Sequence, residues 1–226
     1  MATGRAADAL PPARDFGPSL PTLLRRRFGV RERVSTAVAV VLALLVTGGL
    51  LIRSYATRPE QLVYRAGPVF NIQYSRKVMR RVAPRTGELV RLEARHGKLF
   101  ASITVDRLRV PAYSGNVTSG LLPVYVDGYE RQLRRSEDAF VLRDEGNARV
   151  NSAQGYQVGF RSGPPGHFTW ARDMMLFPAD VNVRDGVLLR LRQSKVGTVN
   201  NHDINLLNSV RRAFKSFDFG TDRAKW

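Results

Sequence analysis

The residues best suited to chemistry in this chain are its three histidines, and their spacing argues against a catalytic or metal site. His96 stands beside a glycine in an expected turn, His167 follows a Pro-Pro-Gly loop, and His202 opens the last expected helix. None of them forms the HExxH-like arrangement, in which two histidines on one helix face bind zinc. We expect all three to be surface residues.

Other patterns of catalytic residues are missing as well. The chain has no cysteine, which removes disulfides, thiolate metal ligands and cysteine nucleophiles. It has no G-x-S-x-G turn, no G-x-G-x-x-G loop and no P-loop. We therefore predict a non-enzymatic protein without catalytic residues, metal or cofactor. A Ser/His/Asp site needs only to meet in space, so a cell-envelope hydrolase remains an alternative.

Positive charge is the strongest compositional signal. The net charge is +17, and only +4 of it lies in residues 1–33, so the remaining chain carries +13. Such a domain is attracted to anionic surfaces, with about 1 kcal/mol per basic residue close to an anionic membrane. We expect membrane lipids as partners, with contacts at two clusters on expected helices: Arg131, Arg134, Arg135, Arg211, Arg212 and Lys215.

A long apolar segment near the N-terminus predicts a transmembrane helix. Residues 34–52 read VSTAVAVVLALLVTGGLLI, without a charge or a polar face. At 1.5 Å per residue they would extend about 28 Å, close to the thickness of a bilayer's hydrocarbon core. We predict a span over residues 34–53, represented by Val34, Leu42, Leu45, Gly48 and Ile52.

The flanking charges predict the orientation of this span. Five arginines lie shortly before it and two shortly after it, so the N-terminus is expected in the cytoplasm and the C-terminal domain outside. A cleaved signal peptide is the alternative, because Ser54-Tyr55-Ala56 resembles a cleavage site and Arg25-Arg26-Arg27-Phe28 an export signal. Arg53 and the length of the apolar run favour an uncleaved anchor.

The rest of the chain predicts mostly β-strands. Alternating or β-branched runs occur at 70–74, 88–94, 98–110, 140–143, 148–150, 156–160, 167–177 and 186–194. Short turns join several of these runs, including Arg95-His96-Gly97 and the stretch 144–147, so we expect antiparallel pairing.

Two amphipathic helices are expected among these strands. One follows Ser119 as N-cap and turns Leu122, Val126, Tyr129 and Leu133 inward. The other follows Asn200 or Asn201 and turns Ile204, Leu207, Val210 and Phe214 inward. The fold class is therefore α+β, with an antiparallel sheet flanked by helices as an α/β sandwich, preceded by one transmembrane helix.

The order of these elements resembles that of PsbP-like and LpqN-like domains. The resemblance covers about residues 68–219 and is carried by FNIQY at 70–74, YVDGYERQLRR at 125–135, GYQVGF at 155–160, GVLLRLRQS at 186–194 and FKSF at 214–217. A Trp-containing segment that often follows the first strand in such domains is replaced by Ser75-Arg76-Lys77-Val78-Met79. The resemblance implies an accessory or binding role without shared catalytic residues.

We therefore divide the chain into four parts: a disordered basic cytoplasmic tail over 1–33, a transmembrane helix over 34–53, a tether over 54–67 and an extracytoplasmic α+β domain over 68–220. The favoured function is a single-pass accessory or binding module of a bacterial cell membrane, which could also contact another envelope protein. A bitopic assembly subunit, similar in length and topology to the single-span scaffold of type IV secretion systems, is an alternative. No nucleic-acid partner is expected on that side of the membrane.

The anchor is tested by a charge at its centre. Replacing Leu44 with Arg should cost about 3 kcal/mol of insertion free energy and reduce the protein recovered in carbonate-washed membranes. The wild-type protein should remain in the pellet. Release of the wild-type protein by carbonate would contradict the anchor.

Overall fold

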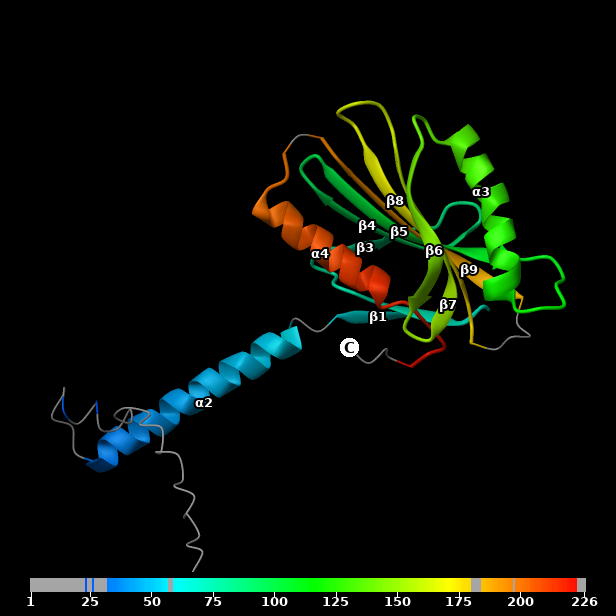
Figure 1. Ribbon diagram of the computed structural model, residues 1–226. Helices are drawn as coiled ribbons and strands as arrows, with labels where there is room; N and C mark the ends of the chain where they lie inside the picture. The colour runs from blue at the N-terminus through cyan, green and yellow to red at the C-terminus, as the bar shows by residue number, and fades with distance from the viewer. Residues whose placement is uncertain are drawn as a thin grey trace, which may run out of the picture. The chain divides into compact units, whose positions relative to one another are not determined.

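The apolar N-terminal segment forms one helix, α2, which runs from Glu32 to Ala56 over 25 residues (Figure 1). The computed structural model describes residues 23, 26, 32–56, 59–179, 184–196 and 198–222. The chain divides into two compact units, Met1–Thr57 and Arg58–Trp226. The helix and the domain are therefore described separately.

The side chains described on α2, at residues 37–51, are nearly all exposed and apolar. Leu42 is 47% exposed and Leu45 66% exposed. The hydroxyl of Thr47 donates to the carbonyl oxygen of Ala43 at 2.8 Å. No helix in the described part of the chain is long and apolar enough to cross a membrane. The predicted tail lies outside the described residues except for 23, 26 and the start of α2, as do the side chains of Val34 and Ile52.

A seven-stranded antiparallel sheet forms the centre of the second unit. Its strand order is β3-β4-β5-β9-β8-β7-β6, so the last pair of long strands in the chain is placed between two hairpins. The strands are β3 (Arg80–Val82), β4 (Glu88–His96), β5 (Leu99–Arg109), β6 (Val141–Val150), β7 (Ala153–Ser162), β8 (Thr169–Phe177) and β9 (Asp185–Lys195).

A second sheet of three short strands has the order β1-β2-β10. They are β1 (Glu60–Tyr64), β2 (Phe70–Tyr74) and β10 (Asp218–Phe219). Phe70, Ile72 and Phe217 are fully buried here, and they belong to the same apolar core as one face of the large sheet. The beginning and the end of the domain are thus brought together, because β1 and β10 both pair with β2.

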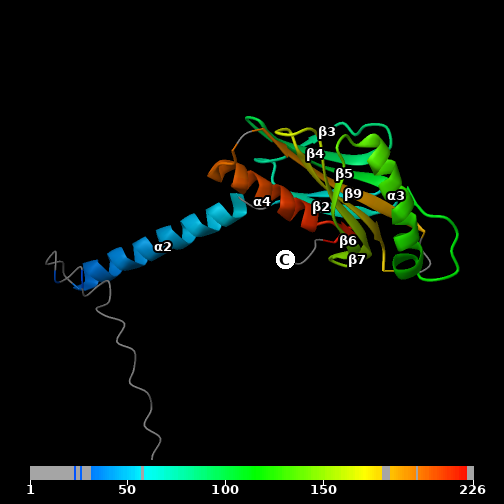
Figure 2. The same ribbon diagram turned by 45° about the horizontal axis from the view of Figure 1, so that its top comes forward.

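Two helices cover opposite faces of the large sheet. α3 (Leu122–Ser136) follows a π-helical turn, η1 (Val117–Leu121), and packs through Leu122, Val126 and Leu133 into one apolar cluster. α4 (Asn201–Lys215) packs through Val210 and Phe214 into the other cluster, which also contains β1 and β2. The strands run between the two helices in Figures 1 and 2.

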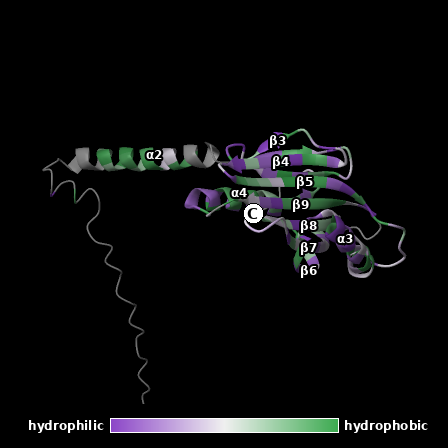
Figure 3. Cartoon of the chain, turned by 90° about the horizontal axis from the view of Figure 1, so that it is seen from above, coloured by the Kyte–Doolittle hydropathy of each residue, from purple (hydrophilic) through white to green (hydrophobic). Residues whose placement is uncertain are grey.

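Strand alternation explains why the sheet has two apolar faces. Val187, Leu189 and Leu191 of β9 enter the α4-side core, whereas Leu188 enters the α3-side core. Hydrophobic and hydrophilic residues both occur along β4 and β5 (Figure 3). The predicted α+β sandwich with an antiparallel sheet and helices on its faces is confirmed.

Several predicted elements differ in the structure. Part of the predicted tether is regular, because α2 continues to Ala56 and β1 begins at Glu60. The expected turn at 144–147 lies inside β6 instead. β6 is an edge strand, so its polar residues are exposed to solvent. A β-bulge after Leu142 and a φ of 151° at Gly146 bend the strand without reversing it.

The helix ends and faces also need correction. Ser119 lies within η1, and the side chain of Asn116 caps that turn by accepting from the backbone N–H groups of residues 118 and 119. Asn200 caps α4 as predicted. Ile204 was expected inward but is 45% exposed, and Leu206 is buried in its place. The apolar residues after Asp203 fit two adjacent helical faces, and only the packing against the sheet selects one.

The packing of both helices is tested by buried charges. Leu133→Asp on α3 and Phe214→Asp on α4 should each lower the free energy of unfolding by several kcal/mol, about 3 or more, because each places a charge in an apolar core. Val124→Asp is the matched control, since Val124 is 73% exposed on α3. Melting of both core variants at the wild-type temperature would show that these helices do not pack as described.

Candidate functional site

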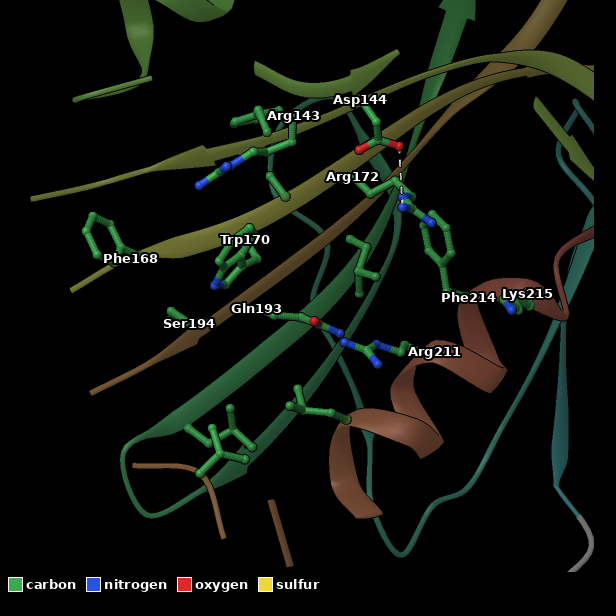
Figure 4. A pocket seen from close by; sticks show the side chains of 16 residues that line it. Arg143, Asp144, Phe168, Trp170, Arg172, Gln193, Ser194, Arg211, Phe214 and Lys215 are labelled. Carbon is green, nitrogen blue, oxygen red and sulfur yellow. Dashed lines mark hydrogen bonds and ion pairs between the residues drawn. The ribbon is translucent and has the colours of Figure 1, made fainter. Parts of the chain in front are cut away.

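A cleft of about 820 Å³ lies on the α4-side face of the large sheet. Residues of β5 to β9 form its floor and one wall, and α4 with the segment before it forms the other wall (Figure 4). This volume lies in the range of small-molecule sites, about 300–1,000 Å³.

Strand register positions the polar residues of the floor. Trp170 and Arg172 are two residues apart on β8 and therefore share a face, and Trp170 is the direct neighbour of Gln193 on β9. Asp144 of β6 is opposite Gly159 of β7, where an added Cβ would lie only 1.8 Å from Asp144 Oδ1. The glycine thus leaves room for the carboxylate, which lies 3.5 Å from Arg172 Nη2.

Several hydrogen-bond donors of the cleft have no partner among the described residues. Gln193 is only 9% exposed, and its buried Nε2 forms no hydrogen bond. Figure 4 shows the Gln193 side chain extending toward Arg211 of α4. Arg211 and Lys215 lie one helical turn apart and form no ion pair with any residue that the structure describes. A buried donor without a partner costs about 1–3 kcal/mol, which a bound acceptor would recover.

The charges of the cleft do not balance. Four basic side chains, from Arg143, Arg172, Arg211 and Lys215, and one carboxylate, from Asp144, are among its described lining residues. Asp144 also accepts from Gln157 Nε2 at 3.0 Å, so its charge is engaged on two sides. The excess positive charge favours a phosphate or carboxylate group, which guanidinium groups can bind through paired hydrogen bonds.

An aromatic surface completes the cleft. Trp170 is 51% exposed, and the guanidinium carbon of Arg143 lies 5.4 Å from its ring centroid. The guanidinium carbon of Arg161 lies 4.1 Å from the ring centroid of Phe168. An exposed tryptophan offers a large apolar area with little conformational freedom, which suits a ligand contact.

The structure separates the two basic clusters predicted from the sequence. Arg211 and Lys215 line the cleft, and Arg212 is exposed outside it. The other cluster lies on α3, on the opposite face of the sheet, where Arg131 pairs with Asp127 at 2.6 Å. Arg134 lies 4.0 Å from Glu130 and above Phe140, and Arg135 is exposed. The two clusters therefore cannot form one continuous binding surface.

The α3-side face holds a buried ion pair that is satisfied internally. Asp173 is 1% exposed, accepts from the hydroxyl of Tyr129 at 2.6 Å and pairs with Arg192. Burial and the neighbouring carboxylate raise the pKa of Tyr129, so the phenol remains a donor. Burial alone would lower the pKa of Arg192, but Asp173 raises it. Because Tyr129, Asp173 and Arg192 are partners of one another, this cluster does not need a ligand to satisfy it.

Two of the histidines, His96 and His202, lie beside a carboxylate at the start of α4. His96 Nδ1 lies 3.2 Å from Asp203 Oδ1, and the rings of His96 and His202 are 4.2 Å apart. Asp203 Oδ2 also accepts from the backbone N–H of Asn200 at 3.0 Å, as part of the helix cap. The hydrogen bonds of the described residues include none from a serine or threonine hydroxyl to these rings. No group of three or more residues able to hold a metal ion occurs among them either.

Comparisons with known proteins concern the fold. No protein-family model and no curated protein sequence matches the chain. Among solved structures, LpqN of Mycobacterium tuberculosis, described as involved in cell envelope biogenesis, matches at 9% identity with a TM-score of 0.46, covering 72% of this chain and 92% of LpqN. CyanoP, the PsbP of the cyanobacterium Synechocystis, matches at 11% identity and a TM-score of 0.44, covering 73% and 94%. These are the two kinds of domain that the sequence resembles.

Arg211 and Lys215, predicted from the sequence as contacts to an anionic surface, line the cleft, and its other polar residues were not predicted. Arg143, Arg172 and Gln193 stand in strands without a motif, and only the strand register brings them to one face. The structure places Trp170 half exposed in the cleft. The spacing of Trp170 and Arg172 was the one available signal, since strand residues two apart share a face.

A carboxyl pair on the α3 side makes the fold sensitive to pH. Burial raises the pKa of Glu130 on α3 to about 7, and the neighbouring carboxyl of Glu145 on β6 adds to this effect. Arg134 acts in the opposite direction. The folded protein therefore holds this proton more tightly than the unfolded chain does.

Stability should consequently fall as pH rises from the ordinary carboxyl range toward about 7. Glu130→Gln, which mimics the protonated form, should remove about 1 kcal/mol of this loss, a figure that allows for solvent screening. Urea unfolding of both proteins at about pH 5 and about pH 8 measures the difference. Parallel pH dependence of the two proteins would contradict the assignment.

Proposed function

We propose that this chain is a membrane-anchored, extracytoplasmic accessory module that binds an anionic ligand in the cleft beside α4 and performs no catalysis. One observation carries the proposal: a half-open cleft combines four basic side chains and the unpaired amide of Gln193 with a single carboxylate. In a site partly shielded from water, such a set of donors stabilises negative charge.

The anchoring part of the proposal rests on α2 and its flanks. The uncharged residues 34–52 lie within the helix Glu32–Ala56, with the larger group of arginines on its N-terminal side. Only residues 57–59 separate α2 from β1.

The non-catalytic part rests on the chemistry of the cleft. Guanidinium, ammonium and amide groups bind and orient charge but supply no nucleophile or base at neutral pH, and the carboxylate of Asp144 is engaged by Arg172 and Gln157. No histidine is among the described residues that line the cleft, and Ser194 lines it without one. The arrangement favours capture or presentation of a ligand over its conversion.

Native mass spectrometry of the full chain tests this function. The protein is extracted from the membranes of the cells that make it, in a mild neutral detergent. We expect the wild type to carry a bound anionic mass and Arg211→Glu to lose most of it, about tenfold or more, because the substitution replaces an attractive charge with a repulsive one.

Arg212→Glu is the matched control. It changes the net charge by the same amount, at the next position of the same helix but outside the cleft. The control should retain the ligand. A wild type without any bound mass, or equal loss in both variants, would overturn the proposed function.

A further inference from the structure

We infer that the ligand of the cleft is an anionic lipid of the bilayer, bound by its phosphate at Gln193 and Arg211 and by its hydrocarbon portion along the Trp170 wall. This inference rests on the proposed function and names the class of ligand. The two halves of the cleft carry it, because one half consists of unpaired donors and the other of exposed apolar groups.

The anion-binding half is defined by a buried amide. The Nε2 of Gln193 is enclosed without a hydrogen-bond partner, at a position where the floor of the cleft faces α4. Arg211 lies opposite it in Figure 4, with Lys215 one turn further along the helix. The carboxylate of Asp144 is engaged by Arg172 and Gln157. A phosphate here would accept from Gln193 and Arg211 together, which neutral groups cannot do equally well.

The apolar half is too large for a simple anion. Trp170 is 51% exposed and Val199 52% exposed, and Leu207 is only partly buried above the same cleft. An inorganic phosphate bound at Gln193 would leave these surfaces in water. A hydrocarbon chain would cover them, and the cleft volume of about 820 Å³ has room for both parts of a lipid.

The proposed anchor gives the source of such a ligand. If α2 spans the bilayer, lipids are the amphiphiles present at high local concentration near the domain, and the phosphate is their usual anionic group. The basic cleft selects those with net negative charge. The same reasoning disfavours a soluble anion, which would use only the donor half.

The fluorescence of Trp170 tests the inference directly. The chain has two tryptophans, so Trp226→Phe leaves Trp170 as the only emitter. The full-length Trp226→Phe protein is placed in nanodiscs of phosphatidylcholine and titrated with dihexanoyl phosphatidic acid. We expect a saturable blue shift, because hydrocarbon replaces water beside the indole ring. Arg211→Gln should weaken the binding about tenfold or more, and Arg212→Gln should not.

Two further titrations separate the parts of the ligand. One titrant is dihexanoyl phosphatidylcholine, which has the chains without net charge, and the other is inorganic phosphate, which has the charge without chains. Each should bind with less than about a tenth of the affinity of dihexanoyl phosphatidic acid. An equal response to phosphatidylcholine would overturn the anionic requirement, and an equal response to phosphate would overturn the apolar one.

Other outcomes are equally decisive. No shift with phosphatidic acid, or equal weakening in both arginine variants, would overturn the inference. Circular dichroism melting of each variant checks that it is folded. A negative result here combined with a bound anionic mass in native mass spectrometry would leave the proposed function standing with a different anion.

Discussion

The attachment of α4 to the sheets is the constraint on which the cleft depends. At its N-terminus, Asp203 Oδ1 lies 3.2 Å from Nδ1 of His96, the last residue of β4. The same carboxylate accepts from Asn200 N within the helix cap. At the other end, the buried hydroxyl of Ser216 is within 2.8 Å of Gln73 N and 3.0 Å of Gln73 O on β2. With both ends held and Val210 and Phe214 in the core, the helix face that carries Arg211 is fixed over the floor of the cleft.

Strand alternation places the buried ion pair of the large sheet on one face and the polar residues of the cleft on the other. Asp173 and Arg192 point to the α3 side, where they form an ion pair and Asp173 is buried. The next residues along the same strands, Arg172 and Gln193, point to the α4 side, where Gln193 has no partner. A shift of one residue in either strand would exchange these sets. On the α4 side, the unpaired amide of Gln193 therefore lies on the same face as the cleft.

The sequence allowed the architecture to be predicted but not most of the site. Alternation in β7 and β9 and the spacing of Leu122, Val126 and Leu133 reflect the burial of individual residues, which can be predicted from the local sequence. The cleft depends on contacts between distant segments, such as Trp170 beside Gln193, which the sequence encodes only through register. β6 was misread as two strands and a turn for the same reason, since its edge position tolerates Asp144 and Gly146 within a strand. The basic face of α4 with Arg211 and Lys215 could be recognised because helical spacing is visible in the sequence, but its position beside the cleft could not.

Photoaffinity labelling in intact membranes tests most directly whether the cleft beside α4 is the ligand site. Cells would take up a phospholipid precursor with a diazirine in its acyl chain, and irradiation followed by peptide mapping would locate the attached lipid in the full-length protein. Outside α2, we expect labelling to concentrate in the segments around Trp170 and between Val199 and Leu207. Labelling of α3 in preference to these segments, or of α2 alone, would contradict it.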